Sequence, residues 1–276
     1  MTPEDDKLAQ PYDLPEIVKR VRAQTPARLL AGRSGAAYRT STQLELREAH
    51  AAARDAVRAE MNLLTDLGND FVRKWNLFEV CSRAASKDEY LLRPDLGRHL
   101  NDASRAELRK RCATGHDLQI VIGDGLSVTA VAMQVPQLLP LLSEGAKTRG
   151  WSVGEIFVIR YCRVGILNEL GELLGPKVAV LLIGERPGLA TAESLSAYMA
   201  YQPKAPDTDA NRNLISNIHA RGVSTEQAAQ RILSLAGSMM NTRTSGCQLR
   251  EELRVTSAPK PQPQSMIMPP ECRTKP

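Results

Sequence analysis

Hydrophobic residues change their spacing near residue 117 of the chain. Before this point they recur at helical intervals, and after it short aliphatic runs alternate with further helical segments. The runs at 118–123 and 178–183 are apolar on both faces and end at glycine, which is typical of strands buried on both sides in a parallel sheet. A third run at 155–161 lies between them. The pattern therefore predicts a helical region followed by a sheet.

Helices are predicted between the three strands. One begins at Ser127, is interrupted at Pro136 and resumes to about residue 148, and another covers 165–174 and ends at Gly175. The resulting β-α-β-α-β order implies right-handed crossovers and parallel strands. We expect an α/β fold: a Rossmann-like parallel sheet flanked by helices, with a helical N-terminal segment. A strand at 197–201 and a helix at 225–240, opened by a capping box at Ser224, complete the pattern.

The region before the sheet predicts four helices, at 14–23, 42–62, 66–76 and 103–113. Ser41 and Asp102 are suited to cap two of them. The alanine-rich stripe of the helix at 42–62 favours packing in a helical layer over an isolated arm, because alanine lets another helix approach closely. Residues 90–98 are expected to form a turn. The basic, glycine-interrupted stretch at 26–35 is either a connector or a docking arm.

These patterns divide the chain into four parts. We expect a flexible N-terminus at 1–25, a mainly helical region at 26–114, a Rossmann-like domain at 115–243 and a disordered tail at 244–276. Six of the 17 prolines lie between 259 and 276, and a proline-rich polar segment cannot bury enough apolar surface to fold.

Charge and cysteine content narrow the class of protein. The net charge is +5, but no long run of lysine and arginine occurs, so a solvated surface is favoured over nucleic-acid binding. Five scattered cysteines without a CxxC pair indicate reduced thiols rather than a zinc site. Neither a signal peptide nor an apolar stretch of about 18 residues is visible, so no membrane partner is expected.

Candidate chemistry lies in the turns GDGLS (123–127) and GERPG (184–188), because ligands of open α/β sheets bind past the carboxyl ends of the strands. The first turn has Val128 where a dinucleotide-binding motif has its third glycine. Glu185 either pairs with a cation such as Arg186, accepts N–H bonds at a helix start, or accepts hydrogen bonds from a ligand. Arg160 and Arg163 follow the middle strand, where they could bind phosphate or the acidic surface of a partner.

No set of nucleophile, base and orienting group is recognised in the sequence. The four histidines are far apart, and His219 is expected to be a structural hydrogen-bonding residue rather than a catalyst. The residues themselves predict a ligand-binding α/β domain without an evident active site of its own.

Six colinear motifs carry a family resemblance. They are YLLRPDLGR (90–98), IGDGLS (122–127), RYCRV (160–164), GERPGL (184–189), ESLS (193–196) and ISNIH (215–219). In this order and spacing they closely resemble the small (light) subunit of ethanolamine ammonia-lyase, over about residues 25–245. The resemblance implies an adenosylcobalamin-dependent enzyme that converts ethanolamine to acetaldehyde and ammonia. It also implies a large subunit with a TIM-type barrel that holds the substrate, while the small subunit closes over the cobalamin.

The resemblance also implies which residues contact the cofactor. By their motifs, Val164, Glu185 and Leu214 occupy cobalamin-contacting positions, and no catalytic residue is expected in this chain, which is half of a site. Leu214 stands where a family member has cysteine, so an apolar or backbone contact is expected there. Some family members carry a longer N-terminal extension thought to direct them to a bacterial microcompartment. Here the family-like part begins near residue 25, so either that location or the free cytoplasm is expected.

Two other functions stay open on the residues alone. One is a free-standing nucleotide-dependent α/β enzyme, which the incomplete glycine pattern disfavours. The other is a non-catalytic scaffold subunit of a larger assembly.

Overall fold

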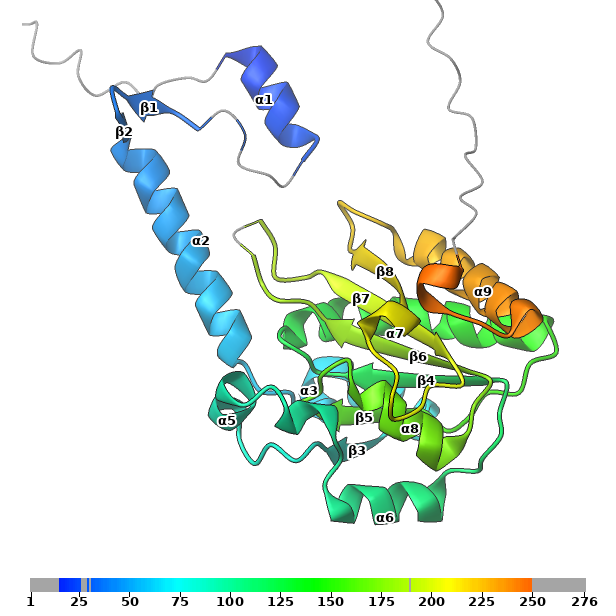
Figure 1. The fold of residues 1–276 in the computed structure, drawn as a ribbon. Helices are drawn as coiled ribbons and strands as arrows, with labels where there is room; N and C mark the ends of the chain where they lie inside the picture. The colour runs from blue at the N-terminus through cyan, green and yellow to red at the C-terminus, as the bar shows by residue number, and fades with distance from the viewer. Residues whose placement is uncertain (1–14, 26–28, 30, 189, 250–276) are drawn as a thin grey trace, which may run out of the picture.

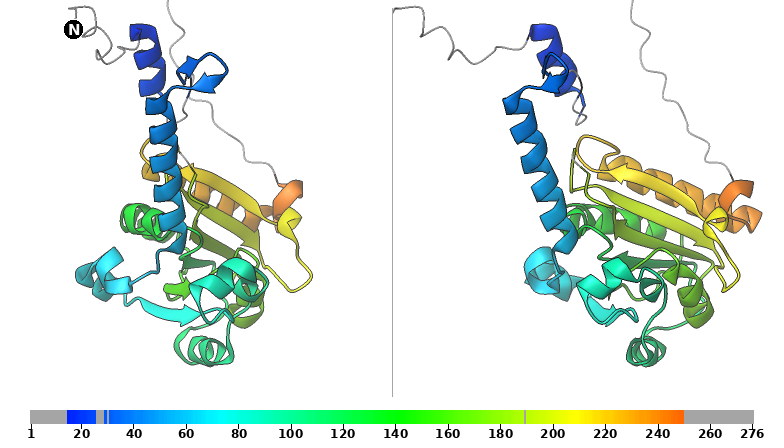
Figure 2. Two further views of the ribbon diagram at one scale, coloured as in Figure 1. Left: turned by 90° about the vertical axis from the view of Figure 1, so that its left-hand side faces the viewer. Right: turned by 60° about the vertical axis from the view of Figure 1, so that its left-hand side comes forward.

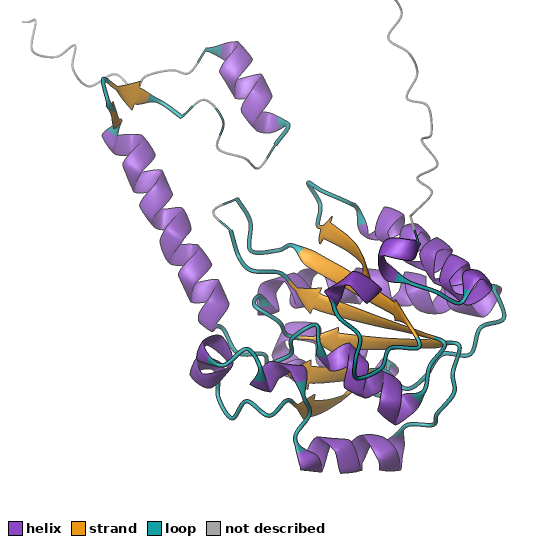
Figure 3. Cartoon of the chain, in the orientation of Figure 1, coloured by secondary structure: helices purple, strands orange, loops and turns teal. Residues whose placement is uncertain are grey.

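A six-stranded sheet with helices on both faces forms the centre of the protein (Figures 1 and 3). The computed structural model describes residues 15–25, 29, 31–188 and 190–249. The strands, in their order across the sheet, are β3 (Phe78–Cys81), β5 (Phe157–Arg160), β4 (Leu118–Gly123), β6 (Val178–Gly184), β7 (Leu195–Tyr201) and β8 (Asn213–Ile218).

The sheet is mixed, which corrects the expected all-parallel arrangement. Strands β3, β5, β4 and β6 are parallel, as predicted for the three aliphatic runs. Strand β7 is antiparallel to β6, and β8 is antiparallel to β7. The described residues of the short segment between β6 and β7, 185–188 and 190–194, contain no helix, and without a crossover helix the chain returns antiparallel beside β6. The sequence did not predict β8, because exposed positions interrupt its apolar ones.

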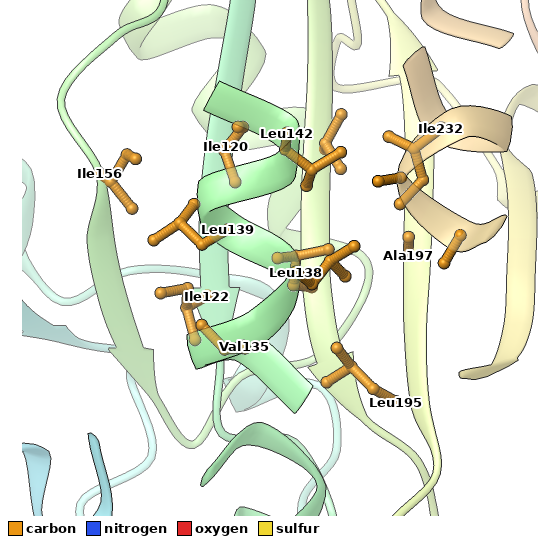
Figure 4. Packing of buried hydrophobic residues seen from close by; sticks show 14 of the residues in the cluster. Ile120, Ile122, Val135, Leu138, Leu139, Leu142, Ile156, Leu195, Ala197 and Ile232 are labelled. Carbon is orange, nitrogen blue, oxygen red and sulfur yellow. The ribbon is translucent and has the colours of Figure 1, made fainter. Parts of the chain in front are cut away.

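Alternate residues of each central strand face two separate cores. Ile120 and Ile122 pack with α7 (Val128–Thr148) and α9 (Thr225–Thr242), as Figure 4 shows for part of this cluster. Val121 faces the other side, with α6 (Asp102–Arg111) and α8 (Ile166–Leu174). Burial on both faces explains why β4 and β6 are apolar at every position except Gln119.

Helix α7 runs without a break through Pro136 and Pro140, so the predicted interruption is wrong. A proline inside a helix costs about 3 kcal/mol, since it removes a hydrogen bond and crowds the preceding turn. Burying a large aliphatic side chain contributes about 1.5–3 kcal/mol. Helix α7 buries several around the prolines, and together they exceed the proline cost: Val135, Leu138, Leu139 and Leu142.

The N-terminal region stands away from the sheet (Figure 2). It contains α1 (Glu16–Ala23), a small hairpin of β1 (Arg33–Ser34) and β2 (Ala37–Tyr38), and α2 (Thr40–Arg58). Of the residues of α2 only Thr42 is buried, so its expected place in a helical layer is wrong. The alanines on its apolar stripe offer little surface to bury, which leaves α2 as an arm whose last part touches α7.

Several predicted boundaries also shift. The helix expected at 66–76 is two short helices, α3 (Leu63–Leu67) and α4 (Asn69–Lys74), because Gly68 between them has a positive φ of 83°. The expected turn at 90–98 includes the end of α5 (Lys87–Leu92) and a 3-10 turn, η2 (Leu96–Arg98). Asn101, not Asp102, caps α6, and α2 begins at Thr40 without a side-chain cap from Ser41.

Helix α1 confirms the helix predicted at 14–23, and Ser224 caps α9 as predicted, since its Oγ accepts from the N–H of Gln227. The expectations for residues 1–14 and for most of the proline-rich tail, from residue 250, lie outside the described residues.

An ion pair at the start of β4 makes the free energy of unfolding depend on pH. Asp117 accepts from Lys177 Nζ at 2.7 Å and from the N–H of Ser152 at 2.8 Å. These bonds, with Lys177 the largest cause, lower the pKa of Asp117 to about 2. Because an unfolded aspartate titrates near pH 3.9, this stabilisation is complete above about pH 4 and is lost as the pH falls towards 2.

We therefore expect Asp117→Asn to lower the urea midpoint at pH 7 and to leave it nearly unchanged at pH 2. Asp70→Asn, which removes an exposed pair with Arg73, is the matched control and should have little effect at either pH. A loss for Asp117→Asn that is the same at both pH values would contradict this account.

Candidate functional site

An open cleft of about 1100 Å³ lies beside the antiparallel end of the sheet. One wall consists of η2, α6 and α8, and the other contains Tyr198 of β7 and Leu214 of β8. Ala197 and Ile215, their neighbours in sequence, point into the core under α9. Tyr198 and Leu214 therefore lie on the opposite face of these two strands, and Leu214 is 45% exposed.

The structure brings two of the three predicted cofactor-binding residues together. Val164, in the turn between β5 and α8, and Leu214 both line the cleft. Glu185 does not line it, but follows β6 and lies next to Ser196 on β7. Ser196 and Tyr198 are two residues apart on one strand face, so Glu185 adjoins the cleft along that face.

Three donors from two separate motifs hold the Glu185 carboxylate. Ser194 Oγ donates to it at 2.8 Å, Ser196 Oγ donates to its other oxygen, and the N–H of Asn217 donates at 3.3 Å. Glu185 thus pairs neither with Arg186 nor with a helix start. A carboxylate offers about four acceptor positions, so this half-buried group can accept a further hydrogen bond from a ligand.

Asn217 reaches Glu185 through an unusual backbone conformation. Its φ is 61°, and it lies where the pairing of β8 with β7 shifts in register, so it has no regular pairing partner on β7. Buried His219 bonds the Asn217 Oδ1 through Nε2 at 2.7 Å and accepts from the N–H of Arg221 at 3.2 Å. The prediction that His219 is a structural hydrogen-bonding residue is confirmed.

A fully buried carboxylate positions the turn that carries Val164. Asp124, at the end of β4, accepts from the N–H groups of Tyr161 and Cys162, both at 2.9 Å. Burial raises the pKa of Asp124, and the charge of Lys87 opposes part of this shift. Buried Lys87 donates to the carbonyl of Gly125 at 3.3 Å, and burial lowers its pKa.

Sequence reasoning missed this pair because it considered only the glycines of the GDG turn. A charged residue directly after a largely apolar strand was the available signal for Asp124. No local signal marked Lys87 as its neighbour.

The glycines of this turn serve packing within the chain. Gly125 has a φ of 59°, and a Cβ on it would lie 2.4 Å from the carbonyl oxygen of Gly184. The N–H of Leu126 donates to the same oxygen at 3.0 Å. The backbone at the end of β6 therefore fills the space in which a dinucleotide-binding turn would receive a phosphate.

The two arginines expected on one rim have different surroundings. Arg160 pairs with Glu60 at 2.8 Å and with Glu79 at 3.6 Å, and it does not line the cleft. Arg163 lines the cleft, and its guanidinium donates to the carbonyl oxygen of Tyr90 at 3.2 Å. The central carbon of this guanidinium lies 4.2 Å from the centre of the Tyr90 ring.

The described part of the chain has no evident metal site and no evident membrane-spanning segment. There, no three histidine, cysteine or acidic side chains come together as metal ligands, and no helix is long and apolar enough to cross a membrane. The fold and the site define an α/β protein with a mixed sheet, whose open cleft is built beside the antiparallel end of that sheet.

Comparison with known proteins identifies the family. Residues 15–250 match the family model of the ethanolamine ammonia-lyase light chain (EutC). The ethanolamine ammonia-lyase small subunit of Clostridium perfringens is 41% identical over 85% of this chain and 78% of its own length. The small subunit of Pseudomonas syringae is 40% identical over 86% of this chain and 84% of its own length. The small subunit of Clostridium acetobutylicum is 36% identical over 89% of this chain and 99% of its own length. The chain belongs to the family of ethanolamine ammonia-lyase small subunits.

Proposed function

We propose that this chain covers adenosylcobalamin in a two-subunit ethanolamine ammonia-lyase, in which the large subunit binds ethanolamine. One observation carries the proposal: Val164 and Leu214, which are distant in sequence, line a single open cleft, and Glu185 adjoins it. The membership of this chain in a family of small subunits supports a large-subunit partner.

The residues fit the chemistry of a cobalamin. Its rim carries amide groups on short apolar arms, so it needs hydrogen-bond acceptors next to apolar surface. Glu185 offers a carboxylate that is already oriented by three donors, and Val164 and Leu214 offer apolar contacts. When bound, the cofactor supplies radical chemistry, while the protein supplies position and exclusion of water.

In this role the chain needs no acid or base of its own. Asp124 fixes the turn that bears Val164, and Lys87 holds the preceding turn through the carbonyl of Gly125. His219 and Asn217 fix the strand end beside Glu185. These bonds order the contact surface in advance, which limits the entropy lost when a large ligand binds.

The competing functions have less support. A nucleotide-dependent enzyme would need an open phosphate turn, and the backbone of Gly184 occupies that place. A scaffold subunit would not need an acceptor held by three donors beside an open cleft.

Reconstitution tests the proposal. We expect acetaldehyde formation from ethanolamine and adenosylcobalamin only when this chain and a large subunit from the same genome are both present. The cobalamin spectrum, recorded in parallel, reports binding. A large subunit that is folded and equally active alone, or a complex that binds no cobalamin, would refute the shared site.

A further inference from the structure

We propose that Arg98 binds the phosphodiester of the cobalamin nucleotide loop, with Arg109 as a second cation lining the same cleft. Both arginines line the cleft that contains Val164 and Leu214. This inference rests on the proposed function and adds to it a specific contact with an anion, the phosphodiester being the one anionic group that the cofactor carries.

Two glycines place the side chain of Arg98 beside Val164. A Cβ on Gly165 would lie 3.0 Å from Arg98 Cγ and 3.1 Å from Cδ, so the stem of Arg98 crosses the start of α8 where Gly165 leaves space. A Cβ on Gly97 would lie 2.8 Å from the carbonyl oxygen of Tyr161. The N–H of Arg163 donates to Gly97 O at 2.8 Å, which fastens η2 to the turn that bears Val164.

Arg98 and Arg109 differ from Arg105 and Arg212, two other arginines of the cleft, in their pairing, while Arg163 is held by the carbonyl of Tyr90. Arg105 pairs with Glu169 and Asp102, and Arg212 pairs with Asp209. Within the described residues, no carboxylate lies within 4.0 Å of the guanidinium of Arg98 or Arg109, and both side chains belong to exposed residues. Two cations on the cleft wall are therefore available to a ligand.

Local stability does not explain the position of Arg98. A cation beside the N-terminus of a helix is unfavourable, because the helix dipole is positive at that end. The nearby Arg163 adds a further positive charge. The N–H groups of Ile166 and Leu167 already donate to Arg163 O and Val164 O, so side chains rather than the helix backbone would hold the anion.

Arginine suits a phosphodiester because its planar donors match two phosphate oxygens at once. A cobinamide lacks the nucleotide and its phosphodiester but keeps the corrin ring and its amides. Comparing the two ligands therefore separates contacts with the nucleotide loop from contacts with the corrin ring and its amides, and the charge-keeping Arg98→Lys variant tests whether the loop contact is with the anion.

The test uses the complex of this chain with its large subunit. Dissociation constants for cyanocobalamin and dicyanocobinamide are measured by absorbance titration for wild type, Arg98→Gln and Arg98→Lys. Arg93→Gln is the matched control, since Arg93 lies in the same segment but pairs with Asp95 at 2.7 Å and does not line the cleft.

We expect Arg98→Gln to weaken cyanocobalamin about 10- to 100-fold and to leave dicyanocobinamide unchanged, with Arg98→Lys in between. Equal weakening of both ligands, or of neither, would overturn the phosphodiester contact while leaving the proposed function intact. Arg98-dependent binding of adenosine monophosphate with unchanged cobalamin binding would overturn it in favour of a free nucleotide. Failure of the wild-type complex to bind cobalamin would instead refute the proposed function.

Discussion

Replacing Asp124 with alanine is expected to lower the free energy of unfolding by about 2–6 kcal/mol, because two buried backbone donors lose their acceptor at about 1–3 kcal/mol each. The carboxylate is fully buried, and both of its oxygens accept from backbone N–H groups, those of Tyr161 and Cys162. Its loss leaves both donors unsatisfied and removes the larger of the two negative charges, those of Asp124 and Glu60, that act on buried Lys87.

The effect should extend to the cleft, because Tyr161 has a φ of 55° and non-glycine residues hold such conformations only when their surroundings enforce them. Without Asp124, the turn from Tyr161 to Val164 loses the bonds that enforce its shape.

Urea unfolding followed by circular dichroism measures the loss. Asp124→Asn keeps the volume and one acceptor, so a smaller decrease is expected for it. Asp70→Ala, at an exposed position, should change the free energy by less than about 0.5 kcal/mol. A loss below about 1 kcal/mol for Asp124→Ala would show that the turn does not depend on the buried carboxylate.

Replacing Glu185 with alanine is expected to weaken cobalamin binding by the reconstituted complex about 10- to 100-fold, the equivalent of one hydrogen bond to a charged acceptor. The carboxylate is held by Ser194, Ser196 and Asn217, so it is oriented before the ligand arrives and little entropy is lost on binding.

Absorbance titration of the complex measures this effect. Glu193→Ala is the matched control, because Glu193 is an exposed carboxylate of the same segment. We expect Glu193→Ala to bind cobalamin like wild type. Unchanged affinity in Glu185→Ala would reject Glu185 as a cofactor contact, and equal losses in both variants would point to a general effect of charge.

The pattern along the chain predicted the part of the sheet that is buried on both faces. Strands β4 and β6 are apolar at every position except Gln119 because helices cover both sides, and this burial is visible in the sequence itself. The same pattern did not predict β8, since only one face of that strand is buried and the other forms the cleft. The arm of α2 was misplaced for a related reason: an apolar stripe indicates which face packs, but not whether a partner within the chain is present.

The candidate site divides in the same way. Motif order was sufficient to single out Val164, Glu185 and Leu214, and the structure places two of them in one cleft. The donors to Glu185 were not predicted, and neither was the proximity of buried Asp124 to Lys87. A hydrogen bond or a charge interaction between distant residues produces no periodic pattern in the sequence.

For this protein the sequence by itself determined the α/β class, three of the four parallel strands and the helices that cover them. These features depend on local periodicity and on burial, and both can be recognised from the order of apolar and polar residues in the sequence. Only the tertiary structure decided the antiparallel end of the sheet, the exposed arm, and the meeting of Glu185 with Ser196 and Asn217. Those features depend on contacts between distant segments, whose direction and register no local pattern specifies.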